Sequence, residues 1–226
     1  MTAQPLGSPG TIDDLAHLRK CATSALVADA LDALGRRSQV LGHDLLQLAG
    51  DGVLVGRAFP VALRPVSGNS ATPYTGLLAA LDAVSAGEVF VLPSRRATDV
   101  GLWGELLSTA CAERGVLGVV TDGTVRDLAR VRDLRFPTFG TGTMPADISG
   151  RYEITAHGVA GVIDGVSIQP GDVIVGDVDG VVVVPQDLVV RVTNLVREKD
   201  RGESQFRVAV LSGLLPSEAF ERYGVL

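Results

Sequence analysis

Three charged side chains in the middle of the chain have the types and the spacing to bind a metal ion and an oxygen anion. Twenty residues separate Glu105 from the adjacent pair Arg126 and Asp127. Carboxylate and water oxygens are the ligands that Mg²⁺ and Mn²⁺ prefer. The planar fork of a guanidinium can hold a carboxylate or enolate oxygen. The three residues therefore predict a metal-assisted site in which an arginine binds an oxygen anion.

Both parts of this pattern lie where a predicted strand leads into a predicted helix. Apolar runs at 89–92 and 116–122 predict strands, and helical spacing follows at 104–115 and 124–134. Ligands gather at such places because strand ends open into crevices and helix N-termini present free amide groups. If the two strands are neighbours, both carboxylates lie on one rim. Taken alone, an acid and an arginine in a first helical turn are more often a solvated pair.

The start of the helix at 104–115 adds backbone donors to the predicted rim. The amides of Leu106 and Leu107 belong to its first turn, where N–H groups have no partner within the helix. They could bind an anion beside Glu105. Trp103, just before this helix, is more simply interpreted as a packing residue than as a surface for substrate.

The ends of the chain predict helices. Residues 1–10 are rich in Pro, Gly and Ser and predict a flexible N-terminal arm. Helical spacing at 11–22 and 23–34 predicts an N-terminal helical hairpin. A charged helix at 186–212 and a shorter one at 216–223 close the chain, so that 11–226 is predicted to form a single domain.

The segments between them predict strands, which makes the fold α/β. Strand patterns at 53–55 and 58–63 precede a helix at 71–84, with a turn at 68–70. From Gly158 onward, glycines and Pro170 interrupt runs of valine, a pattern typical of a curved, barrel-like β-layer.

Composition excludes several classes of protein. The net charge is −6 and the isoelectric point is near 5.0, which disfavours nucleic-acid binding because such surfaces need a basic patch. Cys21 and Cys111 lack metal-ligand spacing and predict free thiols in a reducing compartment. No segment predicts a membrane span or a secretion signal, so we expect a cytoplasmic protein without a membrane partner.

The sequence resembles the RraA-like family. The run WGELLSTACAERGVLGVVTDGTVRD, followed by RFPTFGTG, carries the family's signature of an acid, twenty residues and Arg-Asp. Three further segments are similar: TSALVADALDALG, LVGRAFPV and PGDVIVGDVDGVVVVP. The resemblance covers most of residues 23–225. It implies a three-layered β/β/α fold like that of the swivelling phosphohistidine domains, assembled as a homotrimer or as a hexamer formed by two trimers.

The resemblance also implies a role for each site residue. Asp127 would be the direct ligand of Mg²⁺ or Mn²⁺, and Glu105 would contact the metal through water. Arg126 would bind the 2-oxo oxygen of the substrate, while the amides at Gly104, Leu106 and Leu107 would hold its carboxylate. Glu203, in the C-terminal helix, resembles the acid that family members donate to a neighbouring subunit's site.

Three departures from the family pattern bear on catalysis and substrate specificity. Glu105 stands where the aldolases often have Asp, and Pro60 stands where Thr is expected. The segment SRRA replaces a glycine-rich or acidic turn before the site. Arg95 and Arg96 could therefore bind a second substrate carboxylate, or they could be exposed loop residues.

Together these features predict a class II pyruvate aldolase that uses a small 2-oxo acid. It would cleave 4-hydroxy-2-oxo acids such as 4-hydroxy-4-methyl-2-oxoglutarate to pyruvate and a 2-oxo acid, and would decarboxylate oxaloacetate. A Schiff-base route is disfavoured because the two lysines, Lys20 and Lys199, lie outside the motif loops. The alternative is a non-enzymatic regulator that binds a ribonuclease or another protein, as the family's namesake does.

Overall fold

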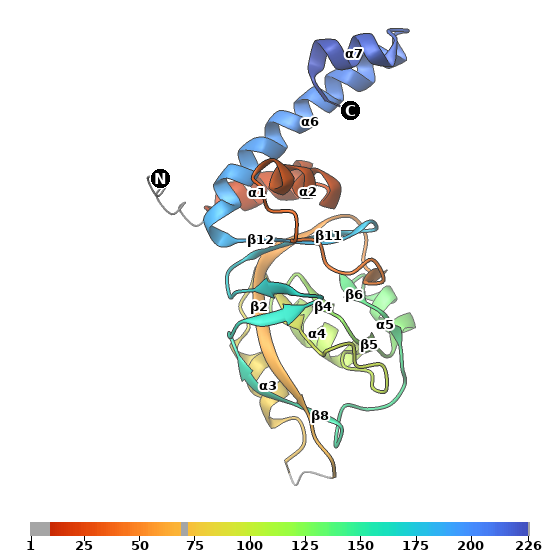
Figure 1. The fold of residues 1–226 in the computed structure, drawn as a ribbon. Helices are drawn as coiled ribbons and strands as arrows, with labels where there is room; N and C mark the ends of the chain where they lie inside the picture. Colours follow the sequence, from red (N-terminus) through yellow and green to blue (C-terminus); the bar gives the residue numbers. More distant parts are fainter. Residues whose placement is uncertain (1–9, 69–71, 226) are drawn as a thin grey trace.

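The computed structural model describes residues 10–68 and 72–225 of the chain (Figure 1). Its main sheet contains eight strands: β1 (Leu46–Ala49), β2 (Leu54–Pro65), β3 (Glu88–Leu92), β4 (Gly118–Thr121), β6 (Thr138–Gly140), β8 (Tyr152–His157), β11 (Val173–Asp177) and β12 (Gly180–Val184). The order is β1-β6-β4-β3-β2-β11-β12, and β8 pairs with the far end of β2. Strands β2, β3, β4 and β6 run parallel to one another, so their carboxyl ends meet at one edge.

Successive side chains of the central strands face different cores. Val89 and Val91 of β3 pack with the hairpin of β9 (Gly161–Ile163) and β10 (Val166–Ile168) and with the curled strands β11 and β12. Phe90 and Leu92 point the other way, into the core under the helices. A strand buried on both faces needs apolar residues at every position, which explains the uninterrupted sequence VFVL.

Three helices cover the parallel strands on this second side. They are α3 (Thr75–Ala83), α4 (Glu105–Glu113) and α5 (Leu128–Asp133). Leu77 of α3, Cys111 of α4 and Val131 of α5 belong to one buried cluster with Phe90. The hairpin layer, the parallel strands and the helices form the predicted β/β/α arrangement, which is confirmed.

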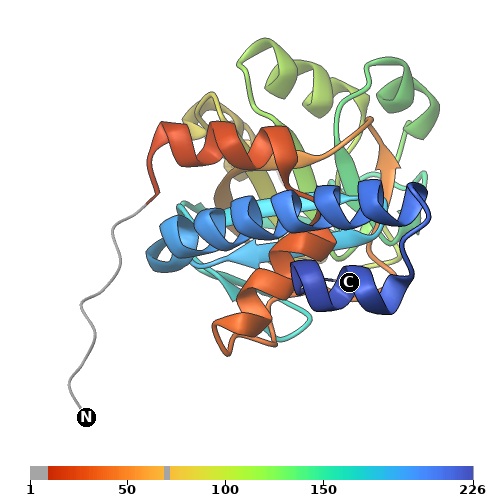
Figure 2. The ribbon, with the colours of Figure 1, turned by 90° about the horizontal axis from the view of Figure 1, so that it is seen from above.

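The N- and C-terminal helices cover β11 and β12. They are α1 (Ile12–Cys21), α2 (Ser24–Ala33), the 3₁₀ turn η1 (Gln186–Leu188), α6 (Val189–Leu211) and α7 (Pro216–Tyr223). The helices α1 and α2 both pack on α6, as Figure 2 shows from above. Beyond these contacts α6 projects from the body and carries α7 alongside it (Figure 1). None of the helices in the described residues is long and apolar enough to cross a membrane.

Several sequence predictions need correction. The strands predicted at 53–55 and 58–63 are one continuous strand, β2, which bends enough to pair with β3 and β11 near its start and with β8 near its end. The strands β1 and β8 were not predicted. Gly10 is buried, and its carbonyl accepts a hydrogen bond from Arg57, so it belongs to the fold; residues 1–9 of the predicted arm lie outside the described residues.

Two helix starts also differ from the prediction. The helix predicted at 71–84 begins at Thr75, because Tyr74 has a left-handed backbone with φ 68° that a helix cannot contain. Residues 69–71 of the predicted turn and helix lie outside the described residues. The helix predicted at 124–134 is shorter, because Thr124–Val125 form β5, paired with β7 (Gly142–Thr143), and α5 starts only after Asp127.

Candidate active site

The loops that follow β3 and β4 lie side by side and are tied together through their backbones. The Leu102 amide donates to the Thr124 carbonyl at 2.8 Å, and the Arg126 amide donates to the Trp103 carbonyl at 2.7 Å. Residues 101–103, in the loop after β3, thus run alongside β5 like an added strand. This arrangement places Gly104, at the start of α4, directly beside Arg126.

Two glycines permit this close approach. A Cβ on Gly101 would lie 2.5 Å from the Met144 carbonyl oxygen, and one on Gly104 would lie 2.8 Å from Asp127 Oδ2. Both distances are shorter than non-bonded atoms accept. The glycines in VGLWG therefore bring the start of α4 against the Arg126-Asp127 pair.

Arg126 is held between two carboxylates. Its Nη1 lies 3.2 Å from Asp147 Oδ1, and its Nε lies 3.6 Å from Asp127 Oδ2. Tyr74 donates a hydrogen bond to the other oxygen of Asp147. Partial burial opposes ionisation of Asp147, but the Tyr74 hydrogen bond and the Arg126 charge together hold its pKa below the usual range. The same hydrogen bond, with partial burial, raises the pKa of Tyr74.

Asp127 has the properties of an available ligand. It is the N-cap residue of α5 with φ 55°, yet its side chain accepts no capping hydrogen bond. Its carboxylate is 45% exposed. An exposed carboxylate whose charged contact with Arg126 is as long as 3.6 Å suits the hard, oxygen-rich coordination of Mg²⁺ or Mn²⁺. Within residues 10–68 and 72–225 no three His, Cys, Asp or Glu side chains gather into a metal cage.

The N-terminus of α4 supplies the predicted amides. Gly104 is its N-cap and has no side chain to accept hydrogen bonds from the first turn. Both Leu106 and Leu107 line the same cavity as Arg126. The first-turn amides and the helix dipole favour an anion at this position.

Glu105 begins α4 on the same rim as Asp127, but its side chain points elsewhere. Its Oε1 accepts a hydrogen bond from the Thr109 hydroxyl at 3.1 Å, and Glu105 is absent from the described residues that line the cavity. The structure therefore brings Arg126, Asp127 and the α4 amides together and leaves the Glu105 carboxylate one turn along its own helix.

The cavity has a volume of about 360 Å³. Sequence reasoning missed two of its polar residues, Tyr74 and Asp147. Asp147 follows β6, which pairs in parallel with β4. Ligands gather at the carboxyl ends of parallel strands, and applying this rule to the segment after β6 as well would have identified Asp147.

Of the remaining candidates, Arg95, Arg96 and Glu203 are not among the described residues that line the cavity. Arg96 forms ion pairs with Asp44 and Asp164, and Arg95 is an exposed loop residue with φ 56°. Glu203 lies on α6, beside a groove lined also by Phe206, Leu211 and Val225. Trp103 is 1% exposed and packs against Phe90 and Phe136, as predicted, with its edge forming part of the cavity wall.

The β/β/α layers and a polar site at the ends of parallel strands define the class of this protein. Residues 24–183 match the RraA-like family, described as Aldolase/RraA. Because the match spans more than half of the chain, the protein belongs to the RraA-like family. The resemblance inferred from the sequence motif is confirmed.

Individual relatives support the same assignment. The chain is 29% identical over 209 residues to protein DlpA of Legionella pneumophila, covering 92% of this chain but only 33% of that protein. It is 31% identical over 170 residues, 75% of each chain, to a Halalkalibacterium halodurans protein named "Putative 4-hydroxy-4-methyl-2-oxoglutarate aldolase". The structure of Streptomyces coelicolor RraAS2, titled an unusual member of the RNase ES inhibitor RraA protein family, superposes with a TM-score of 0.78 at 27% identity, covering 88% of this chain and 98% of that one.

Proposed function

We propose that this protein is a divalent-metal-dependent pyruvate aldolase that cleaves 4-hydroxy-2-oxo acids and also decarboxylates oxaloacetate. One observation carries the proposal: Arg126, Asp127 and the uncapped N-terminus of α4 meet at one cavity. The similarity to a protein named as an aldolase of this type supports it. The free thiols of Cys21 and Cys111 suit a reducing compartment, and the proposal places the enzyme in the cytoplasm.

Asp127 would hold Mg²⁺ or Mn²⁺, with Glu105 contacting it through water, and the bound ion would supply Lewis-acid stabilisation of negative charge. The chain's own residues divide the remaining work. The amides at the start of α4 bind the substrate carboxylate, and Arg126 binds the 2-oxo oxygen. These contacts orient the C3–C4 bond for cleavage.

Arg126 stabilises the charge that develops during cleavage. When the C3–C4 bond breaks, its electron pair moves toward C2 and the 2-oxo oxygen gains negative charge, giving the enolate of pyruvate. The N–H donors of Arg126 are already fixed by Asp147, 3.2 Å away, so little reorganisation is needed as this charge appears. Loss of carbon dioxide from oxaloacetate produces the same enolate, and one site can therefore serve both reactions.

Glu105 has the role of accepting the proton of the C4 hydroxyl through water. This role requires its carboxylate to leave Thr109 and turn toward the cavity. The side chain is half-buried, and a rotation about its own bonds is sufficient, because the helix start already lies on the correct rim. A Thr109→Ala variant would remove the competing hydrogen bond and is expected to retain turnover.

The test is a pyruvate-release assay over 4-hydroxy-2-oxo acids and oxaloacetate, with and without Mg²⁺ or Mn²⁺. Asp127→Asn is expected to abolish most turnover, because it removes the carboxylate charge but keeps the side-chain shape. Asp133→Asn, on an exposed position of the same helix, is the matched control and is expected to behave as wild type. Near-normal turnover of Asp127→Asn at saturating metal would contradict the proposal.

We also propose that the chain assembles as a homotrimer or hexamer. The projecting part of α6 and the adjoining α7 expose Val208, Leu211, Leu215 and Phe220, a surface that a second copy would cover (Figure 1). In such an assembly Glu203, which lies on this projection, would reach a neighbour's cavity. Light scattering measures the mass. Mixed assemblies of Glu203→Gln and Arg126→Lys chains would recover activity only if the two residues act across a subunit boundary.

A regulator that binds a ribonuclease is the second candidate. The similarity to RraAS2, whose title places it in a family of ribonuclease inhibitors, favours it. Inhibition of an RNase ES-type enzyme by the purified protein, unaffected by Asp127→Asn, would support this function. Pyruvate release that depends on Asp127 would favour the aldolase.

A further inference from the structure

The wall of the cavity beside Arg126 is mostly apolar. Of the fifteen described residues that line it, nine are aliphatic residues or tryptophan: Leu77, Leu78, Leu81, Leu102, Trp103, Leu106, Leu107, Ala110 and Ile148. They come from α3, the loop before α4, the first turns of α4 and the loop after β6. The polar groups are concentrated on Arg126, Asp127, Asp147 and Tyr74.

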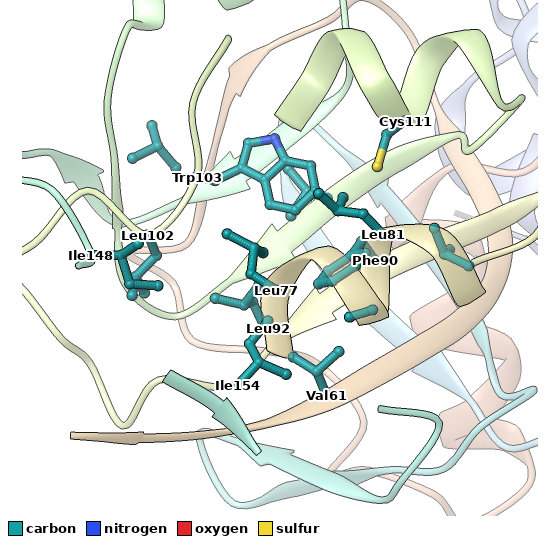
Figure 3. Close-up of a cluster of buried hydrophobic side chains, with 14 of the residues drawn as sticks. Val61, Leu77, Leu81, Phe90, Leu92, Leu102, Trp103, Cys111, Ile148 and Ile154 are labelled. Carbon is teal, nitrogen blue, oxygen red and sulfur yellow. The ribbon is translucent and has the colours of Figure 1, made fainter. Parts of the chain in front are cut away.

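The inner part of this apolar wall belongs to the protein's buried core, whereas Leu78 and Leu106 are 56% and 73% exposed. Leu77, Leu81 and Trp103 are each less than 8% exposed and belong to the cluster that includes Phe90. Figure 3 shows Leu77 and Leu81 of α3 grouped with Trp103, Leu102 and Ile148. The indole N–H of Trp103 donates to Ser108 at 2.9 Å, which fixes the ring. The inner apolar part of the cavity is thus preformed.

The charges in the cavity leave no partner for a second substrate carboxylate. Among the described lining residues, Arg126 is the single cation, and the proposed reaction already occupies it with the 2-oxo oxygen. Asp147 would repel a further carboxylate. The sequence offered Arg95 and Arg96 for this task, but neither is among the described residues that line the cavity, and Arg96 is paired with Asp44 and Asp164.

We propose that, among 2-oxo acids long enough to reach this wall, the cavity selects those whose far end is uncharged and apolar, such as a branched alkyl or phenyl group, over those that end in a carboxylate. The inference rests on the proposed function for the placement of the 2-oxo acid group. A buried carboxylate without a partner is disfavoured, whereas an alkyl group of the same shape gains contact with the leucine wall.

The first test compares two ligands of matched shape that cannot be cleaved. In 5-methyl-2-oxohexanoate an isopropyl group replaces the distal carboxylate of 2-oxoglutarate. Titration calorimetry with Mg²⁺ present is expected to show at least about tenfold tighter binding of the alkyl acid. Equal affinity, or tighter binding of 2-oxoglutarate, would overturn the inference.

The second test places a cation in the apolar wall. Leu78 lines the cavity and is 56% exposed, so Leu78→Arg alters its charge without disturbing the core. This variant is expected to reverse the preference toward 2-oxoglutarate. Val162→Arg, at an equally exposed position on β9 away from the cavity, is the control and is expected to keep the wild-type preference. An unchanged preference in a folded Leu78→Arg protein would contradict the assignment.

Turnover separates failure of this inference from failure of the proposed reaction. Pyruvate release that favours 4-hydroxy-2-oxo acids with an alkyl end supports both. Release that favours 4-hydroxy-4-methyl-2-oxoglutarate overturns the selectivity and leaves the aldolase standing. If no substrate releases pyruvate but the alkyl acid binds more tightly, the cavity assignment stands and the aldolase fails.

Discussion

Two arginines follow neighbouring parallel strands, and the structure gives them opposite roles. Arg96 lies in the loop after β3 and Arg126 follows β5, just after β4. The guanidinium of Arg96 forms hydrogen bonds and ion pairs with Asp44 and Asp164, contacts that raise its pKa above the usual range. Arg126 has looser contacts, at 3.2 and 3.6 Å, and faces a cavity.

The difference shows how to separate a structural arginine from one that can bind a ligand. Each of the three guanidinium nitrogens of Arg96 has a carboxylate partner, and Asp164 links the Arg96 loop to the β9–β10 hairpin. Asp147 and Asp127 contact only Nη1 and Nε of Arg126, so its Nη2 donors can reach a ligand. Position at a strand end identifies both residues as candidates; the number of donors still available decides between them.

Removal of metal is expected to have the largest effect on turnover. It should affect the Arg126 site and leave the Arg96 contacts unchanged. Chelation should abolish pyruvate release, and Mg²⁺ or Mn²⁺ should restore it, because Asp127 alone supplies too little charge at the Arg126 site. Thermal unfolding of the same samples should change little, since the Arg96 contacts need no ion. Full turnover after exhaustive chelation would contradict the metal role.

Exchange of each arginine for lysine comes next. Arg126→Lys is expected to lower turnover by about 10²–10³, because an ammonium cannot reproduce the planar fork at the enolate oxygen. Arg96→Lys should turn over like wild type. The comparison is measured as kcat for oxaloacetate decarboxylation together with melting temperature. Equal losses in both variants would remove the distinction between the two residues.

The loop that carries Arg96 depends on a buried carboxylate. Asp122 is 3% exposed and accepts hydrogen bonds from the Ser94 amide, the Ser94 hydroxyl and the Arg96 amide. Asp122→Asn would turn an amide donor toward at least one of these donors and should cost about 1–3 kcal/mol of stability. Urea unfolding measures it. An unchanged midpoint would mean that the loop does not rely on this residue.

The smallest expected effect is a pH dependence at the Arg126 site. Since the pKa of Asp147 is lowered in the folded state, its stabilising contribution is present above the ordinary aspartate value of 3.8 and is lost as the pH falls through the depressed value. The melting temperature of wild type should therefore exceed that of Asp147→Asn slightly near neutral pH, and the difference should vanish in acid. The effect is small because the side chain is 36% exposed. A difference in melting temperature that persists at low pH would mean that Asp147 stabilises the fold through packing and not through its charge.

The sequence predicted the features that depend on local patterns, namely helix ends and apolar runs. Thr11 and Thr23 cap the first two helices, and Gly115 follows α4 with φ 76°; Thr and Gly are favoured at these positions, which lie at the ends of the predicted helices. The uninterrupted apolar run of β3 was also visible in the sequence. Because such signals depend on near neighbours in the chain, they survive without knowledge of the fold.

Features set by distant segments escaped prediction. The strand β8 begins 87 residues after its partner β2 ends, and only that pairing makes it a strand. The direction of the Glu105 side chain depends on Thr109, and the partner of Arg126 depends on a loop after β6. The motif located Arg126 and Asp127 correctly at one rim, but their neighbours across the cavity came only from the assembled sheet.

The left-handed backbone at Asp127 limits how the chain can change over evolution. At φ 55° most side chains are strained, whereas Gly, Asn and Asp are accepted at low cost. A lineage that abandoned the chemistry but kept the fold would therefore drift to Asn or Gly here, and rarely to a branched residue. Among relatives, the identity of this one residue should thus record whether selection still acts on the reaction or only on the scaffold.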